Sequence, residues 1–172
     1  MAETARLSSW WKVGVLAVVA IELLGGLSGW VSNSGYSNAW FDSLQKPVFM
    51  PPGWTFGVVW PILYAFLGIS LAIILAEPQT HRRRLGLIFF AAQLFLNFAW
   101  SPIFFAAHDI ALAKWVILVM AILAAAAALQ FLRIRKVAGL LLMPYLAWLI
   151  FAASLNVTIE RLNPGMGAPL LH

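Results

Sequence analysis

The sequence contains no cysteine and very little charge. Zero cysteines in 172 residues exclude a disulfide framework and any chemistry that needs a thiolate. Only 10% of the residues are charged, against about 25% in an ordinary soluble domain. With 63% hydrophobic residues and a mean hydropathy of +0.90, a chain this short has too little interior to bury its apolar surface. These features predict an integral membrane protein, whose solvent is largely the lipid bilayer.

The net charge of +5 and the isoelectric point near 10.1 raise the question of a nucleic-acid partner. The basic residues lie in short segments between apolar runs, which is how membrane proteins distribute charge. A soluble nucleic-acid binder is therefore excluded.

Five apolar runs are long enough to cross a hydrocarbon core, which takes roughly 20 helical residues. The runs are continuous and rich in Leu and Ala, without the alternation of a membrane-spanning strand, and helices satisfy every backbone polar group internally. We predict an all-α, five-transmembrane-helix bundle forming a single integral membrane domain over residues 1–172. The helices are expected at about 13–31, 54–76, 85–107, 110–132 and 137–159, with a short tail over 160–172.

The distribution of Lys and Arg predicts an orientation. The side of the N-terminus holds the larger group, namely Arg6, Lys12, Arg82, Arg83, Arg84, Arg133, Arg135 and Lys136. The opposite side holds only Lys46, Lys114 and Arg161. In a bacterial inner membrane, the positive-inside rule then places the N-terminus in the cytoplasm.

The segment 32–53 is the one long connection between predicted helices. Long loops in compact domains are usually functional or disordered. This one carries Trp40 and Phe41 together with the prolines at 47, 51 and 52. We therefore expect it to pack on the mouth of the bundle.

Three of the predicted helices carry aromatic and polar residues at spacings of three or four, so that each set shares one helix face. The sets are Phe56, Trp60 and Tyr64; Gln93, Asn97, Trp100 and Ser101; and Tyr145, Trp148, Ala152, Asn156 and Ile159. Such faces are typical of a cavity for a large, flat, mostly apolar ligand with a few polar handles. The alternative is structural: amides in spans bond neighbouring helices, at roughly 0.6 kcal/mol each, and aromatics form interfacial belts. Trp60, Asn97 and Trp148 lie too deep in their runs for a belt, which favours the cavity.

Glu22 lies at the centre of the first predicted helix, where a charged carboxylate is costly. It is either a proton or cation site, or a protonated side chain hydrogen-bonded to a neighbouring helix. Gly25 and Gly29 share its face in a small-residue pattern typical of close helix contact. We favour the second interpretation.

Signals of catalysis or metal binding are scarce. The histidines at 81, 108 and 172 lie in separate segments without metal-ligand spacing, and the carboxylates other than Glu22 lie at or outside the predicted membrane boundary. No nucleophile–base pair, phosphate-binding loop or dinucleotide fingerprint is found. The sequence predicts neither a metal site nor an acid–base catalytic site.

Three motifs resemble the translocator protein family, also called the tryptophan-rich sensory protein (TspO) or peripheral-type benzodiazepine receptor family, and point to a bacterial member. The loop and second-helix motif comprises Trp40, Phe41, Leu44, Lys46, Pro47, Phe49, Pro51, Pro52, Trp54, Phe56, Trp60, Leu63 and Tyr64. The third-helix motif comprises Gln93, Asn97, Trp100, Ser101, Phe104 and Phe105. The fifth-helix motif comprises Pro144, Tyr145, Trp148, Phe151, Ala152, Leu155, Asn156, Leu162 and Asn163.

The resemblance implies a homodimeric membrane receptor or sensor that binds porphyrins such as protoporphyrin IX and benzodiazepine-site ligands, and that regulates or transports porphyrin. The porphyrin is expected as a ligand, and no cofactor is required. By position, Trp60, Asn97 and Trp148 match ligand-contacting residues, Ala152 matches a pocket-wall alanine, and Trp40 and Pro47 match the loop that closes the pocket. The predicted ligand-binding residues are these six together with Phe56, Tyr64, Gln93, Trp100, Tyr145 and Asn156.

The family also implies an alternative, which is enzymatic. Some members are credited with light- and oxygen-dependent breakdown of bound porphyrin, in which Trp148 would act as an electron donor. Two departures from the family pattern matter. The segment 155–161 lacks the tyrosine of a cholesterol-recognition motif, which argues against a sterol ligand. Phe41 stands where members often have tyrosine.

Overall fold

The protein is an all-helical bundle in a computed structural model that describes residues 10–167. The helices are α2 (Trp10–Val31), α3 (Ala39–Ser43), α4 (Gly53–Ala76), α5 (His81–Ser101), the π-helix η1 (Pro102–Ala106), α6 (Ile110–Leu132), α7 (Lys136–Leu141) and α8 (Met143–Leu162). They form 5 spans long and apolar enough to cross a membrane, and the described residues include no strand. The predicted five-span all-α bundle is confirmed. Arg6, His172 and the last residues of the predicted tail lie outside the described part.

Two of the spanning helices begin where side chains cap them. α5 begins at His81 rather than at about 85, because Thr80 accepts a hydrogen bond from the backbone N–H of Arg83 at 3.1 Å. The arginines at 82–84 are therefore helical. α6 begins at Ile110, as expected, where Asp109 accepts from the N–H of Leu112 at 2.8 Å.

The fifth span is not one continuous helix. Its first part, α7, ends at Leu141, and its second part, α8, begins at Met143. Pro144 lies in the first turn of α8 and has no N–H with which to continue the helix hydrogen bonding, so the break falls just before it. α8 then runs on to Leu162, beyond the expected end near 159.

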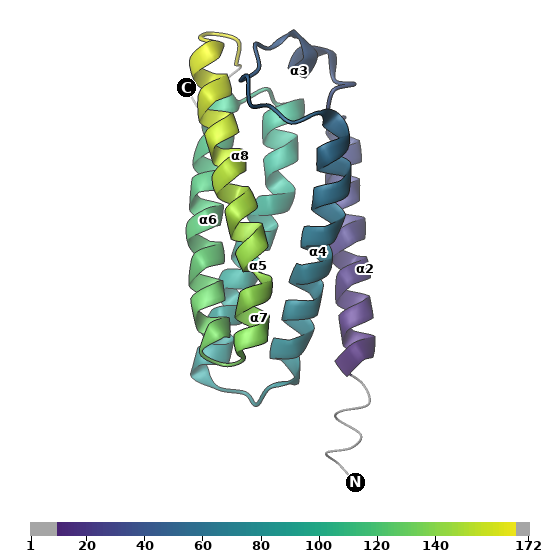
Figure 1. Cartoon of the computed structure of the whole chain (residues 1–172), viewed down its shortest axis with the longest axis vertical. Coiled ribbons are helices and arrows are strands. Elements are labelled where there is room, and N and C mark those ends of the chain that lie inside the picture. Colours follow the sequence, from purple (N-terminus) through teal and green to yellow (C-terminus); the bar gives the residue numbers. More distant parts are fainter. Residues whose placement is uncertain (1–9, 168–172) are drawn as a thin grey trace.

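The spans lie side by side along the long axis of the molecule (Figure 1). α6 packs against α5, α7 and α8, while α2 packs mainly against α4 at one side of the bundle. α2 and α4 approach closely at Gly68, where a β-carbon would come within 2.7 Å of the backbone of Val18. The outward face of α2 exposes Leu16, Leu23 and Leu27, as a lipid-facing surface requires.

The residues between α2 and α4 form what we call the capping loop, residues 32–52, which contains α3. The loop lies over one end of the bundle, beside the end of α8 (Figure 1). Asn38 caps α3 by accepting from the N–H of Phe41 at 3.0 Å and donates to the carbonyl of Phe105 at 3.2 Å. Asn163 at the end of α8 accepts from the N–H of Gln45 at 2.7 Å and donates to its carbonyl at 2.9 Å. The loop is thus held on the mouth of the bundle, as its aromatics and prolines predict.

Candidate ligand-binding cavity

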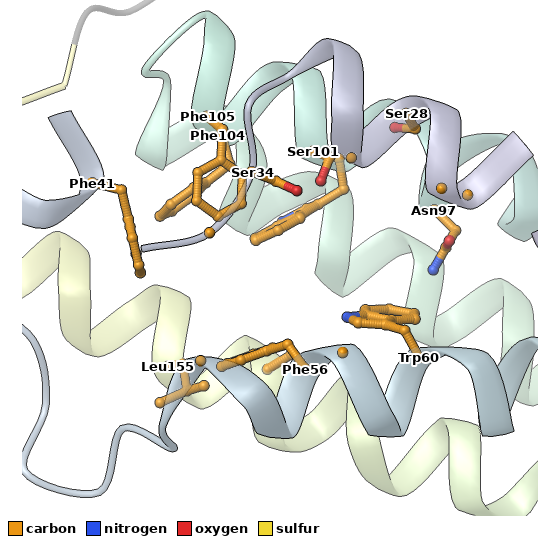
Figure 2. A pocket seen from close by; sticks show the side chains of 18 of the residues that line it. Ser28, Ser34, Phe41, Phe56, Trp60, Asn97, Ser101, Phe104, Phe105 and Leu155 are labelled. Atoms are coloured by element: carbon orange, nitrogen blue, oxygen red, sulfur yellow. The ribbon is translucent and has the colours of Figure 1, made fainter. Parts of the chain in front are cut away.

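A cavity of about 770 Å³ lies beneath the capping loop. This volume falls within the range of roughly 300–1,000 Å³ found for small-molecule sites. Figure 2 shows Trp60 and Phe56 of α4 on one side of it and Ser101, Phe104 and Phe105 on the other. The principal lining side chains are those of Glu22, Ser28, Ser34, Tyr36, Phe41, Met50, Phe56, Trp60, Tyr64, Asn97, Trp100, Ser101, Phe104, Phe105, Ile117, Met120, Trp148, Leu149, Ala152, Leu155, Asn156 and Ile159.

Aromatic rings in mutual contact make up much of this lining. The rings of Trp60 and Trp148 lie 6.5 Å apart at 85°, and Phe56 makes an edge contact with Trp148 at 5.7 Å. Across the cavity, Trp100 stacks on Phe104 at 4.9 Å. Such contacts fix the ring planes, so that the cavity presents flat apolar surfaces.

The π-helical turn η1 contributes to this arrangement. The wider turn follows directly from α5 and places two consecutive side chains, Phe104 and Phe105, in the buried layer beneath the loop. Phe41 of the loop contacts both rings, at 6.0 and 5.1 Å. The loop and the bundle therefore share one aromatic cluster at the mouth of the cavity.

A chain of hydrogen bonds joins three helices at the inner end of the cavity. The Tyr64 hydroxyl donates to Asn97 Oδ1 at 2.8 Å, Asn97 Nδ2 donates to the Tyr145 hydroxyl at 3.1 Å, and that hydroxyl donates to Gln93 Oε1 at 2.7 Å. An amide nitrogen carries two hydrogens, so Asn97 keeps one N–H beyond this chain. Figure 2 shows its amide opposite the ring of Trp60.

Two buried polar atoms of the lining residues have no hydrogen-bond partner among the described residues. They are the indole Nε1 of Trp148 and Oδ1 of Asn156. Asn156 is only 1% exposed, and its Nδ2 is held by the carbonyl of Ile110 at 3.1 Å. Unsatisfied buried groups are costly and uncommon. Both atoms are covered by protein, so two of the lining residues carry a donor and an acceptor whose hydrogen-bonding capacity the described residues leave unused.

The loop end of the cavity has a different electrostatic character. The ammonium group of Lys46 lies 4.9 Å from the ring of Phe41 and 5.6 Å from that of Tyr36. The Tyr36 hydroxyl donates to the carbonyl of Pro51 at 2.9 Å. Partial burial raises the pKa of the Tyr36 phenol above its ordinary value. Lys46, which also pairs with Asp42 at 3.9 Å, thus places a cation beside this aromatic mouth.

The structure brings most of the predicted ligand-binding residues together around this one cavity. The lining includes Phe56, Trp60, Tyr64, Asn97, Trp100, Trp148, Ala152 and Asn156. Gln93 and Tyr145 lie behind it, each 0% exposed, as partners in the hydrogen-bond chain. Whether any of these residues contacts a ligand stays a prediction.

The two predicted loop residues lie outside the lining. Trp40 stacks on His108 at 4.2 Å and donates from its indole N–H to the carbonyl of Met166 at 3.1 Å. Pro47 is buried within the loop, where its carbonyl accepts from the N–H of Met50 at 2.9 Å. Both hold the loop in position, while Phe41, Tyr36 and Met50 supply its cavity-facing side chains.

The sequence interpretation missed the contribution of α2. Its lining residues are Glu22, Gly25, Gly26, Ser28, Gly29 and Trp30. The glycines were a usable signal, since Gly25 does lie in close contact with α4, through the ring of Tyr64. Glu22, however, makes no hydrogen bond or ion pair with any described residue. The favoured interpretation, a hydrogen bond from Glu22 to a neighbouring helix, finds no partner among the described residues and stays a prediction.

Metal binding finds no support in the part of the chain that the structure describes. No group of three or more His, Cys, Asp or Glu side chains there is placed to hold a metal ion. His81 begins α5 and His108 lies beside Trp40, so the two are far apart in the fold.

Five apolar spans around an aromatic cavity under a capping loop define a multi-pass integral membrane protein with an internal cavity of ligand-binding size. Comparison with known proteins then identifies the family. The TspO/MBR family model matches residues 15–162, and the chain belongs to that family.

Named relatives come from bacteria and animals. The chain is 36% identical over 141 residues to Protein CrtK of Rhodobacter capsulatus, covering 81% of this chain and 86% of the relative. It is 36% identical over 154 residues to the tryptophan-rich protein TspO of Chlorobaculum tepidum, covering 85% and 93%. It is 37% identical over 157 residues to the translocator protein of Sus scrofa, covering 87% and 92%.

Proposed function

We propose that this protein is a membrane receptor or sensor that binds tetrapyrroles of the protoporphyrin IX type, and other flat hydrophobic molecules of the benzodiazepine-site type, in the cavity beneath the capping loop. Binding would regulate porphyrin use or accompany its transport. The observation that carries the proposal is the aromatic cavity of about 770 Å³ with two unpartnered buried polar atoms. The names of relatives, which include tryptophan-rich sensory protein and translocator protein, agree with a sensory or carrier role.

The fixed aromatic rings supply the apolar part of recognition. A planar macrocycle can stack against Trp60 or Trp148, and each well-placed aromatic contact contributes about 0.5–1.5 kcal/mol beyond the area that it buries. Because the side chains are already held in place by one another, little conformational entropy is lost on binding.

The polar atoms supply orientation. The N–H of Trp148 and Oδ1 of Asn156 are covered by protein. A side-chain rotation on binding would let the first donate to a ring nitrogen or carbonyl of the ligand and the second accept from an N–H. The second N–H of Asn97 offers another donor at the inner end. A tetrapyrrole carries both kinds of nitrogen at its centre, which suits this combination.

The propionate groups of such a ligand need a cationic partner apart from the aromatic rings. Among residues 10–167, no lysine, arginine or histidine lines the cavity, and Lys46 lies over the rings of Tyr36 and Phe41 at the loop end. We therefore propose that the propionate groups point toward the capping loop and that the macrocycle lies deeper. This orientation pairs the carboxylates with the cation and leaves the apolar surface for the rings.

The membrane setting of the proposal follows from the charges. The start of α2, the start of α5 and the connection from α6 to α7 lie at the end of the bundle opposite the capping loop (Figure 1). These segments carry Lys12, the arginines at 82–84 and the basic residues at 133–136. In a bacterial inner membrane this end would face the cytoplasm, and the cavity would open on the other side. We also propose a homodimer, as the family resemblance implies.

The test is a protoporphyrin IX titration of the detergent-purified protein in darkness, followed by tryptophan quenching and by porphyrin absorbance. Saturable quenching with one site per chain is the expected result, and quenching that rises without saturation would contradict the proposal. The saturated sample is then illuminated in air. A stable spectrum supports a receptor.

The illuminated sample also tests the alternative of light- and oxygen-dependent porphyrin breakdown, in which the bound porphyrin absorbs the light and oxygen is the oxidant. That alternative is favoured by one contact, since the oxidisable ring of Trp148 touches both Phe56 and Trp60 in the cavity lining. Conversion to a discrete product, lost in Trp148→Phe, would move the assignment from receptor to enzyme.

A further inference from the structure

Among the residues that the structure describes, Glu22 is the one acidic side chain that lines the cavity. It lies on the stripe of α2 that faces α4, between Val18, which contacts Gly68, and Gly25, which contacts the ring of Tyr64. Residues four before and three after a helical position share its face. The carboxylate is therefore directed into the bundle, one turn from Tyr64, and it is only partly exposed.

This carboxylate lies without compensation at membrane depth. It occupies the middle of a span, and no hydrogen bond or ion pair joins it to another described residue. Three other described carboxylates have cationic partners: Glu160 is 2.7 Å from Lys114, Asp42 is 3.9 Å from Lys46, and Glu77 pairs with Arg135. A charged group within the bilayer that lacks a protein partner costs several kcal/mol and marks a functional position by default.

We propose that Glu22 forms a cation subsite within the cavity, which receives the protonated nitrogen of an aromatic amine. The inference rests on the proposed function, because the flat part of that ligand would occupy the same aromatic cavity. A ligand ammonium placed there would pair with the carboxylate, and the neighbouring faces of Tyr64 and Trp60 would add cation–π attraction. Glu22 is thus a specificity-determining residue that selects the charge of the substituent at the inner end.

With this subsite, the two ends of the cavity carry opposite charges. Glu22 at the inner end repels a carboxylate, while Lys46 lies beside the rings at the loop end. An anionic substituent is thereby directed toward the loop and a cationic one toward α2. Neither selection follows from the aromatic rings, which accept any flat apolar body.

The test uses three probes with the same anthracene body and different charge: 9-(aminomethyl)anthracene, which is cationic at neutral pH, neutral 9-(hydroxymethyl)anthracene, and anionic anthracene-9-carboxylate. Each is titrated at neutral pH into detergent-purified wild type, Glu22→Gln, Glu22→Asp and Glu77→Gln, and specific binding is defined by displacement with protoporphyrin IX. Glu77→Gln is the matched control, because it removes a carboxylate at the far end of α4, outside the cavity.

We expect wild type and Glu77→Gln to bind the cationic probe at least tenfold more tightly than the neutral one. Glu22→Gln should lose that preference, keep its affinity for the neutral probe and bind the anionic probe more tightly than wild type does. Glu22→Asp, which retains the charge on a shorter side chain, should keep part of the preference. Thermal unfolding verifies that each variant is folded.

An equal cation preference in wild type and Glu22→Gln would overturn the subsite, as would displaceable binding of all three probes to wild type with equal affinity. In both cases the cavity itself remains a ligand site. Failure of the neutral probe and of protoporphyrin IX to bind at all would instead overturn the proposed function, and the subsite with it.

Discussion

The ring of Tyr64 occupies the space that a β-carbon on Gly25 would need. A β-carbon built on Gly25 would lie 2.6 Å from Cζ and 2.8 Å from the hydroxyl oxygen of Tyr64. The same hydroxyl donates to Asn97. Because Gly25 of α2 has no side chain, the ring of Tyr64 on α4 fits against it. In that position the Tyr64 hydroxyl donates to Asn97 on α5.

We expect Gly25→Ala to displace Tyr64, break its hydrogen bond to Asn97 and lower both stability and ligand affinity. Loss of that bond within a buried network costs about 1–3 kcal/mol. Gly26→Ala is the matched control, because a β-carbon there has no atom within 4 Å and alanine is favoured over glycine in a helix by about 1 kcal/mol. Thermal unfolding in detergent measures both, and equal melting temperatures for the two variants would contradict the packing role of Gly25.

Tyr145 links two amides through a single hydroxyl. Tyr145→Phe leaves Asn97 Nδ2 and Gln93 Oε1 without their partner in a fully buried position. We expect a loss of about 1–3 kcal/mol in the free energy of unfolding. Tyr36→Phe is the control, because it removes an exposed hydroxyl that bonds only within the capping loop, and it should change the free energy by less. The reverse order would show that the chain of hydrogen bonds does not join the helices energetically.

Asn163 holds the capping loop on the bundle, so truncation of the Asn163 side chain should change the rate at which a ligand dissociates. Asn163→Ala deletes both hydrogen bonds to the backbone of Gln45. At about 0.5–1.5 kcal/mol each, their loss should raise the dissociation rate of protoporphyrin by severalfold to about tenfold or more. Stopped-flow displacement measures this rate. Ser154→Ala, which removes an exposed hydroxyl bonded only to its own helix, should leave the rate unchanged. An unaltered rate in Asn163→Ala would mean that the loop does not control exit.

Two consecutive alanines of α8 have different surroundings. Ala152 lines the cavity, whereas Ala153 is 9% exposed and packs in the core. We expect Ala152→Leu to weaken porphyrin binding with stability near that of wild type. Ala153→Leu should instead lower stability by about 1–3 kcal/mol through overpacking. Unfolding and binding measured on the same samples distinguish them, and a collapse of the fold in Ala152→Leu would make Ala152 a packing residue.

The fold was predictable because each span is long and continuously apolar. The faces of α4, α5 and α8 were also predictable, since aromatic and amide residues at spacings of three or four must share a face. What periodicity does not give is which members of a face reach the cavity. Tyr145 and Gln93 are on the predicted faces, yet they bond to each other behind the lining residues.

The contribution of α2 was harder to predict, for a physical reason. Its cavity face consists mainly of glycine and serine, which carry no aromatic pattern and are read as helix contact. The role of Glu22 depends on what surrounds it, and one sequence does not contain that information. The loop shows the same limit: Trp40 and Phe41 are adjacent, but only Phe41 lines the cavity, while Trp40 contacts His108 and Met166.

The central claim is that the cavity beneath the capping loop binds the ligand, and dark titration of tryptophan variants tests it most directly. Trp60→Ala and Trp148→Ala should each weaken protoporphyrin IX binding by about tenfold or more, since a stacked aromatic contributes roughly 1–1.5 kcal/mol. Trp115→Ala removes a tryptophan that is 61% exposed on α6 and should bind like wild type. Porphyrin absorbance reports affinity without depending on the number of tryptophans left. Wild-type affinity in folded Trp60→Ala and Trp148→Ala would contradict the claim.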